Sequence, residues 1–348
     1  MTTIVIPTAN RPNVLRTALS SIESQTAREQ IAVVLVSESG GNPASGNVCA
    51  EFPSLPIRYS FRDPTMTLFE HDALLFAEAR ALTAPYVAVL NDEDWWGSDH
   101  IANGVNHLGT QPEATAYWAS SFVVHGESSW FMDCWNMSCW VVTGFGAIDE
   151  VAELGLKEAT LACLGSAPAS RSSLIAEKHA LAESFHETTK IGNPLDKDRL
   201  LFLELARKGP TLVNLVPEVF VRRHTVQDQR TPSPKGSSDD TGAVTRRILQ
   251  LCEEQAINVA EEFERLYDEC PLPAYRPHLV KMFDQPLIQG IRRKKRMPLL
   301  RLRRSKKNMK WMIRQLCPPI GWQAARRLYR FAKPHNPDRN GFFDEVDG

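Results

Sequence analysis

Three consecutive carboxylates, Asp92, Glu93 and Asp94, are the residues whose types and spacing are best suited to chemistry in this chain of 348 residues. They come just after Tyr86 to Leu90, an apolar and β-favouring run with the length of a strand. Carboxylates are not buried without a partner, because removing an ion from water is costly. They therefore either form a solvated acidic turn or hold a cation, and oxygen donors suit Mg²⁺ or Mn²⁺. The triplet alone supports both interpretations equally.

The other strands that the sequence predicts also end in polar residues. Apolar runs predict strands at residues 3–7, 31–36, 56–61 and 86–90, with helical patterns at about 12–25 and 67–83. Strand, helix and strand at this spacing predict a βαβ unit and a parallel sheet. Ligands bind outside the carboxyl ends of the strands in such sheets. We therefore expect one nucleotide pocket, lined by the turn at residues 8–11, Glu38, Arg62 with Asp63, and the acidic triplet.

The pattern changes after a predicted helix at about 98–109. Residues 115–143 are rich in Trp, Phe, Val and Ser and predict antiparallel strands, whereas residues 150–164 predict a helix. A loop leads into a predicted helix at 198–208, which Gly209 closes, and short strands are expected at 212–215 and 218–223. Residues 231–240 have the composition of a linker, and a helix is expected at about 242–268.

The composition excludes several classes of protein. Apolar residues make up 43% of the chain and charged residues 23%, which is typical of a soluble globular protein. No uncharged apolar run reaches the ~18–20 residues that cross a bilayer, and we expect no secretion signal. The seven cysteines are scattered and odd in number. This pattern argues against zinc and favours reduced thiols in a cytoplasmic protein.

Basic residues are concentrated near the end of the chain. Residues 292–333 contain 16 Lys or Arg and no Asp or Glu, although the formal net charge of the whole chain is −1. Alternating basic and apolar residues favour a helix that lies on an anionic membrane surface. Docking onto the acidic body or onto a partner protein is the alternative. Nucleic acid is disfavoured as a partner because no nucleic-acid motif accompanies the charge.

Five segments in the expected order resemble family two glycosyltransferases, which have the α/β fold called GT-A. They are Thr3–Pro12, Val33–Glu38, Leu90–Trp96, Leu195–Gly209 and Val221–His224. The resemblance covers about residues 2–229. It implies a GT-A domain at residues 1–230, with a nucleotide-sugar half at 1–96 and an acceptor half at 97–230. After this domain we expect the linker at 231–240 and then a helical C-terminal region at 241–348, which includes the basic segment 292–333.

The resemblance implies a nucleotide-sugar donor, most often a UDP-sugar, a divalent metal (Mn²⁺ or Mg²⁺) and an inverting single displacement. The residues it implies for the nucleotide-sugar are Pro7, Thr8, Asn10, Arg11, Glu38, Arg62, Asp63, Asp72, Asp92 and Glu93. Those it implies for the metal are Asp94 and Asp92, a DXD pattern, together with His224. Asp198 would be the catalytic base that takes a proton from the attacking hydroxyl group.

Three residues depart from the pattern of the family. Ala9 stands where an aromatic residue is usual, and Asn91 where a further Asp is common. Lys197 precedes Asp198 where the family usually has Glu. Because a neighbouring ammonium group favours the ionised carboxylate and weakens it as a base, Asp196 is kept as the alternative base.

The sequence thus predicts a metal-dependent inverting glycosyltransferase of surface polysaccharide biosynthesis. It would use a saccharide or lipid-linked saccharide acceptor at the cytoplasmic face of the membrane, as a peripheral protein held by residues 292–333. The alternative is a non-catalytic GT-A domain that binds a membrane or a partner through this basic segment. A nucleotidyltransferase would need a glycine-rich loop after the first strand, which residues 8–12 lack.

Overall fold

The computed structural model describes residues 1–40, 43–62, 66, 68–125, 129–132, 139, 142, 151–164, 167–191, 197–223 and 240–269. All of them belong to one compact unit, Met1–Arg301. Their strands form a single mixed sheet in the order β3-β2-β1-β4-β9-β6-β10-β5, with β7 paired to β6 and β8 paired to β10.

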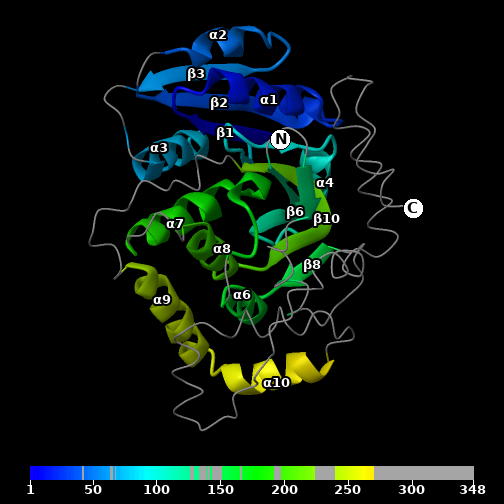
Figure 1. Ribbon diagram of the computed structural model, residues 1–348, viewed down its shortest axis with the longest axis vertical. Coiled ribbons are helices and arrows are strands. Elements are labelled where there is room, and N and C mark those ends of the chain that lie inside the picture. The colour runs from blue at the N-terminus through cyan, green and yellow to red at the C-terminus, as the bar shows by residue number, and fades with distance from the viewer. Residues whose placement is uncertain are drawn as a thin grey trace. The chain divides into compact units, whose positions relative to one another are not determined.

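The first half of the fold carries the parallel part of the sheet (Figure 1). Its elements are β1 (Thr2–Thr8), α1 (Pro12–Glu23), a 3-10 turn η1 (Arg28–Gln30), β2 (Ile31–Ser39), α2 (Ser45–Ala50), β3 (Ile57–Arg62), α3 (Leu68–Arg80) and β4 (Tyr86–Val89). Strand β1 lies between β2 and β4 and is parallel to both, and β3 is parallel to β2. The predicted parallel βαβ arrangement is therefore confirmed, and the four carboxyl ends lie at one edge.

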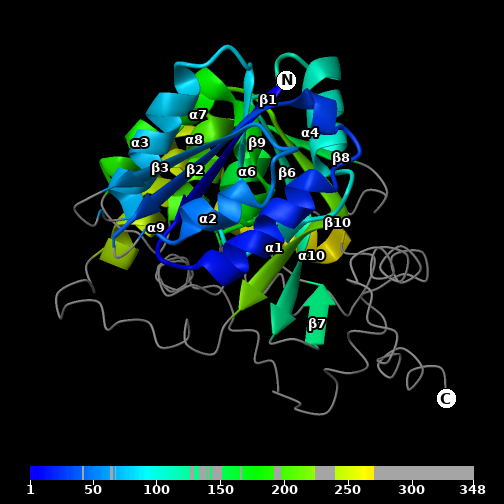
Figure 2. The ribbon, with the colours of Figure 1, turned by 90° about the horizontal axis from the view of Figure 1, so that it is seen from above.

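The second half extends the same sheet with strands of both directions. Its elements are β5 (Trp95–Trp96), α4 (His100–Thr110), β6 (Ala116–His125), β7 (Ser129–Met132), β8 (Val151–Leu154), α6 (Leu156–Ala162), a 3-10 turn η2 (Arg171–Ser173), β9 (Ile175–Glu177), α7 (Lys178–Thr189), α8 (Lys197–Ala206) and β10 (Thr211–Arg223). Strand β9 joins the halves, because it is antiparallel to both β4 and β6. Figure 2 shows β6, β7 and β10 running side by side.

Apolar side chains on both faces of the sheet form the core. Helix α1 begins with a proline in its first turn and buries Leu15, Leu19 and Ile22 along one face. On the other side, α3, α7 and α8 are neighbours (Figure 1). There Trp118 of β6 packs against Phe202 of α8, with ring centroids 5.1 Å apart.

Two predicted elements differ from the structure in the second half. The predicted helix at 150–164 is wrong over its first turn, because Val151–Leu154 is strand β8, paired antiparallel to β10, and the helix begins only after Gly155. The strands expected at 212–215 and 218–223 are one strand, β10. Its register shifts around Pro217, which has no N–H to give to the ladder.

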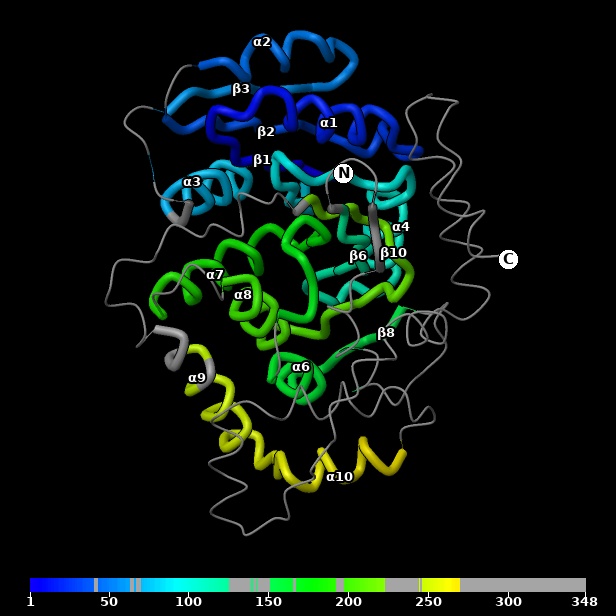
Figure 3. The backbone as a smooth tube through the Cα atoms, in the orientation of Figure 1, coloured from blue at the N-terminus to red at the C-terminus, as the bar shows by residue number. Residues whose placement is uncertain are grey.

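The helix expected at 242–268 is two helices, α9 (Asp240–Glu254) and α10 (Val259–Glu269) (Figure 3). The chain turns at Ala256, whose φ is 53°, and the N–H of Ile257 donates back to the carbonyl of Cys252. No described helix has both the length and the apolar character needed to span a bilayer. Apart from Asp240, the predicted linker lies outside the described residues, as does the basic segment 292–333.

Candidate functional site

The turn after β1 contacts the acidic triplet after β4. Thr8 Oγ1 donates a hydrogen bond of 2.7 Å to Asp92 Oδ2. Arg11 Nη1 lies 2.7 Å from Glu93 Oε2 and 3.5 Å from Asp92 Oδ1. The side chain of Arg11 is half exposed, whereas that of Asp92 is buried. Residues more than 80 positions apart thus meet at the carboxyl edge of the sheet, where the sequence placed them.

Asp94 is buried behind this surface and accepts three hydrogen bonds. The donors are the Ser172 hydroxyl, Asn91 Nδ2 at 3.2 Å and the backbone N–H of Arg222 at 2.9 Å. Burial raises the pKa of Asp94 to about 7, although these donors favour its charged form. Burial also raises the pKa of Asp92, against the hydrogen bond from Thr8. Both carboxyl groups would gain from a nearby cation.

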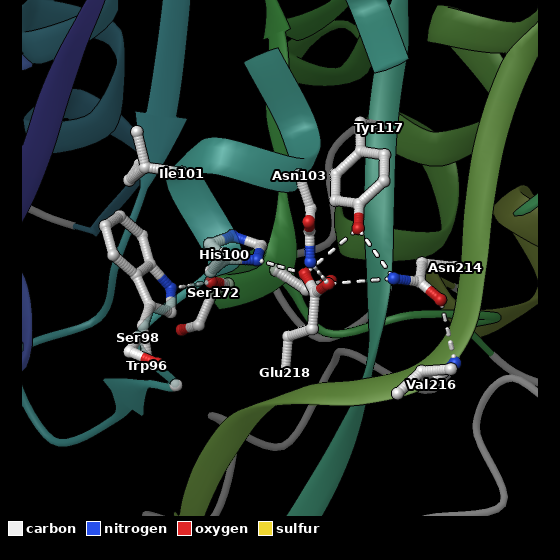
Figure 4. A network of polar contacts seen from close by, with 12 residues as sticks. Trp96, Ser98, His100, Ile101, Asn103, Tyr117, Ser172, Asn214, Val216 and Glu218 are labelled. Atoms are coloured by element: carbon white, nitrogen blue, oxygen red, sulfur yellow. Dashed lines mark hydrogen bonds and ion pairs between the residues drawn. The ribbon is translucent and has the colours of Figure 1, made fainter. Parts of the chain in front are cut away.

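The strand that donates to Asp94 is fixed by a network around Glu218 of β10 (Figure 4). The Glu218 carboxylate accepts hydrogen bonds from Asn214 Nδ2 at 2.8 Å and the Tyr117 hydroxyl at 3.0 Å. Asn103 Nδ2 also donates to it, and His100 Nδ1 lies 2.9 Å from it. These contacts tie β10 to α4 and β6, so that Arg222 has a fixed place beside the acidic triplet.

A polar hollow of ≈520 Å³ lies next to this network. Its lining residues are Asn103, His107, Gln111, Val151, Asn214, Val216 and Glu218. None of the residues that the sequence predicted for the nucleotide-sugar, the metal or the base is among them.

Arg171, which sequence reasoning missed, lies at the centre of a second charged cluster. Its side chain is only 4% exposed and pairs with Asp72 of α3, while Nη2 donates to Asn91 Oδ1 at 2.5 Å. Lys197 Nζ lies 2.5 Å from the same oxygen of Asp72. Burial lowers the pKa of Arg171, but the carboxylates of Asp72, Asp198 and Asp94 outweigh it and raise the pKa overall. Asn91 links this cluster to the acidic triplet, because its Oδ1 accepts from Arg171 and its Nδ2 donates to Asp94.

Asp198 lies in the first turn of α8, directly after Lys197. Its Oδ1 is buried and has no hydrogen-bond partner. Burial and the charge of Arg171 lower the pKa of Lys197 to about 8, although Asp72 and Asp198 act in the opposite direction. Asp196, Asp63 and His224, three further predicted residues, lie outside the described part of the chain.

The remaining predicted residues lie along the same edge. Pro7 is buried in β1, and Asn10 is exposed in the turn, with φ of 56°. Glu38 is fully buried and accepts hydrogen bonds from Ser45, through its N–H at 3.0 Å and its hydroxyl at 2.8 Å, and from the Tyr59 hydroxyl at 2.6 Å. Arg62 pairs with Glu78 and donates to the Ser37 hydroxyl. The nucleotide contacts predicted for these residues stay predictions.

The donor set at the acidic triplet is compatible with a hard cation. Asp94 Oδ1 accepts a single backbone hydrogen bond, so a second lone pair remains, and Asp92 is two residues away. Within the described ranges, no group of three or more His, Cys, Asp or Glu side chains is placed to hold a metal ion. His224, the third predicted ligand, lies outside these ranges.

The mixed sheet has the GT-A fold, as the sequence predicted. The solved structures that the chain resembles include TarS from S. aureus. TarS 1–349 in complex with UDP-GlcNAc matches with a TM-score of 0.53 and 11% identity, over 81% of this chain and 79% of TarS 1–349. TarS 1–349 alone matches with a TM-score of 0.52 and 12% identity, over 95% of this chain and 89% of TarS 1–349. A longer TarS chain matches with a TM-score of 0.52 and 12% identity, over 95% of this chain and 52% of that one.

Neither a protein-family model nor a curated protein sequence matches the chain. At 11–12% identity, the likeness to TarS establishes the fold alone.

Proposed function

We propose that this protein is an inverting glycosyltransferase that moves a sugar from a UDP-sugar to a saccharide or lipid-linked saccharide acceptor. The observation that carries the proposal is the contact of Thr8 and Arg11 with Asp92 and Glu93 at the carboxyl edge of a GT-A sheet. Ligands of open α/β sheets bind at this edge. TarS 1–349, which has the same fold, was solved in complex with UDP-GlcNAc.

The proposed chemistry needs two functions from the chain. Asp198 accepts the proton of the attacking hydroxyl, with Asp196 as the alternative base. Asp92, Asp94 and His224 would hold Mn²⁺ or Mg²⁺, which when bound supplies positive charge for the departing diphosphate. Arg11 and Thr8 hold the acidic triplet in place, and no nucleophilic residue is required for a single displacement with inversion.

We further propose that the reaction belongs to surface polysaccharide biosynthesis on the cytoplasmic face of the membrane. Residues 292–333, with 16 basic side chains, would hold the enzyme there as a peripheral protein. The non-catalytic alternative, a GT-A domain that only binds a membrane or partner, differs in one measurable property: it has no need for a nucleotide.

The decisive experiment measures the thermal stabilisation of the full chain by UDP, GDP, CDP and dTDP, each with and without Mn²⁺. A ligand that binds only the native state stabilises it by about 2.7 kcal/mol at a concentration of 100 Kd. We expect a metal-dependent shift with UDP that Asp94→Asn abolishes. The matched control is Asp99→Ala, an exposed carboxylate five residues further on, which should keep the shift. No shift with any nucleotide would refute the proposal and favour the binding module.

A further inference from the structure

The first observation concerns the environment of Asp198. A buried carboxylate oxygen normally accepts a hydrogen bond, because leaving it unpaired costs free energy. Asp198 Oδ1 is buried and accepts none. Two cations, Arg171 and Lys197, lie near enough for its charge to raise the pKa of each. They are the obvious donors, yet neither donates to Oδ1.

The second observation is where these cations direct their donors. Arg171 Nη1 pairs with Asp72 Oδ2, and Lys197 Nζ lies 2.5 Å from the same oxygen. Asp72 is only 1% exposed and comes from α3, a different element from both cations. Both cations therefore direct a donor to Asp72, and neither donates to Asp198 Oδ1.

This arrangement separates two effects that normally act together. A charge favours the ionised form of a nearby carboxylate through space, whereas a hydrogen bond also occupies a lone pair. A general base must be ionised and must keep a lone pair free for the incoming proton. Arg171 and Lys197, held on Asp72, supply the charge and do not donate to the buried Asp198 Oδ1.

We propose that Asp72 is a positioning residue, which holds Arg171 and Lys197 near Asp198 without a hydrogen bond from either to its Oδ1, so that the Asp198 carboxylate is ionised and keeps a lone pair for the proton of the acceptor hydroxyl. The inference rests on the proposed glycosyl transfer. In that step the hydroxyl O–H bond breaks and its proton passes to Asp198. The hydroxyl oxygen bonds to the anomeric carbon, and the bond to the nucleoside diphosphate breaks with its electron pair leaving on the diphosphate.

The kinetic test uses Asp72→Asn in the full chain with UDP-sugar and acceptor. The variant frees both cations to pair with Asp198, so we expect kcat to fall about 100-fold, with KM for the donor and the affinity for UDP within about threefold of wild type. The acid limb of the pH–rate profile should move down by about one pH unit, because a negative charge is removed. Lys197→Met should move that limb up, and Lys197→Arg should restore it.

The matched control is Lys208→Met. This lysine follows α8 and pairs at the surface with Glu183, so the pH profile of the variant should equal that of wild type. If Asp72→Asn raises KM as much as it lowers kcat, or leaves the acid limb unmoved, Asp72 acts as a ligand contact or as a structural support and the proposal is wrong. Lys197→Met keeps the Arg171 pair with Asp72, so it tests the charge effect even if Asp72→Asn does not fold.

A second measurement does not depend on activity. The pKa of Lys197, about 8, can be followed by NMR in the full chain after ¹³C reductive methylation and assigned with Lys197→Arg. Asp198→Asn should lower it by about one unit, whereas Glu183→Gln should not move it. An unshifted Lys197 overturns the positioning proposal alone, whereas an inactive wild type overturns the proposed function and with it the catalytic part of this inference.

Discussion

Replacement of Arg171 by methionine tests the electrostatic core of the site. The guanidinium group is 4% exposed and pairs with Asp72, which is 1% exposed, so its removal leaves buried carboxylates with one cation fewer. Breaking a buried ion pair by removing one partner costs about 3–5 kcal/mol, because the other charge remains buried. We expect a loss of this size in urea unfolding at pH 8.

Urea unfolding measures the loss in the free energy of unfolding. A shift of the urea midpoint reports this loss directly when the m-value of the variant equals that of wild type. Arg16→Met is the matched control. Arg16 forms a bidentate ion pair with Glu51, but both side chains are almost half exposed, so the free energy of unfolding should hardly change. A double-mutant cycle of Arg171→Met with Asp72→Asn should give a coupling energy of about 0.5–3 kcal/mol. Equal losses for Arg171→Met and Arg16→Met would refute the buried-cluster argument.

Three other outcomes follow from the same structure. Burial lowers the pKa of Lys197 from 10.5 to about 8, so between these pH values the unfolded chain binds a proton that the folded chain does not. As the pH falls from 10.5 to 8, the free energy of unfolding of wild type, measured in urea, should therefore fall by about 3 kcal/mol relative to that of Lys197→Met. Gly104→Ala should cost about 1–3 kcal/mol in thermal or urea unfolding, because the added methyl group meets the side chain of Ile175; Gly109→Ala, which meets nothing, is the control. Removal of residues 292–348 should abolish sedimentation with anionic liposomes, and unchanged sedimentation would disprove the membrane role of the basic segment.

The acidic edge was predictable because its signals are local. Each strand of the first half is an apolar run that ends in polar residues, and parallel strands place all such ends together. The meeting of Thr8 and Arg11 with Asp92 follows from that geometry without any knowledge of side-chain packing. Strand β8 was missed for the opposite reason: Val151–Leu154 is too short to show a period, and its pairing with β10 decides its conformation.

The charged cluster could not be predicted, because its members come from three distant elements. Arg171 lies in a Ser-Arg-Ser-Ser run without periodicity, and only the fold buries it against Asp72 of α3. The one local signal is Ser170, whose side chain accepts from the N–H of Ser172 and starts the turn η2. Glu38 likewise was recognised as a polar strand end, but the convergence of Ser45 and Tyr59 on its carboxylate depends on tertiary packing.

The lysine before Asp198 gains a physical meaning from this cluster. Glycosyltransferases of the resembled family usually have Glu at this position, and a glutamate at 197 would add a carboxylate to those of Asp72, Asp94 and Asp198, which already act on Arg171. With Lys197, Asp72 instead pairs with two cations, Arg171 and Lys197. Lys197→Glu should therefore destabilise the fold more than Lys197→Met, in urea unfolding at pH 8, because both variants lack the ammonium group but only Glu adds a negative charge beside the buried Asp72. Equal stability of the two variants would show that the cluster is not balanced by charge, and the departure from the family pattern would then have another cause.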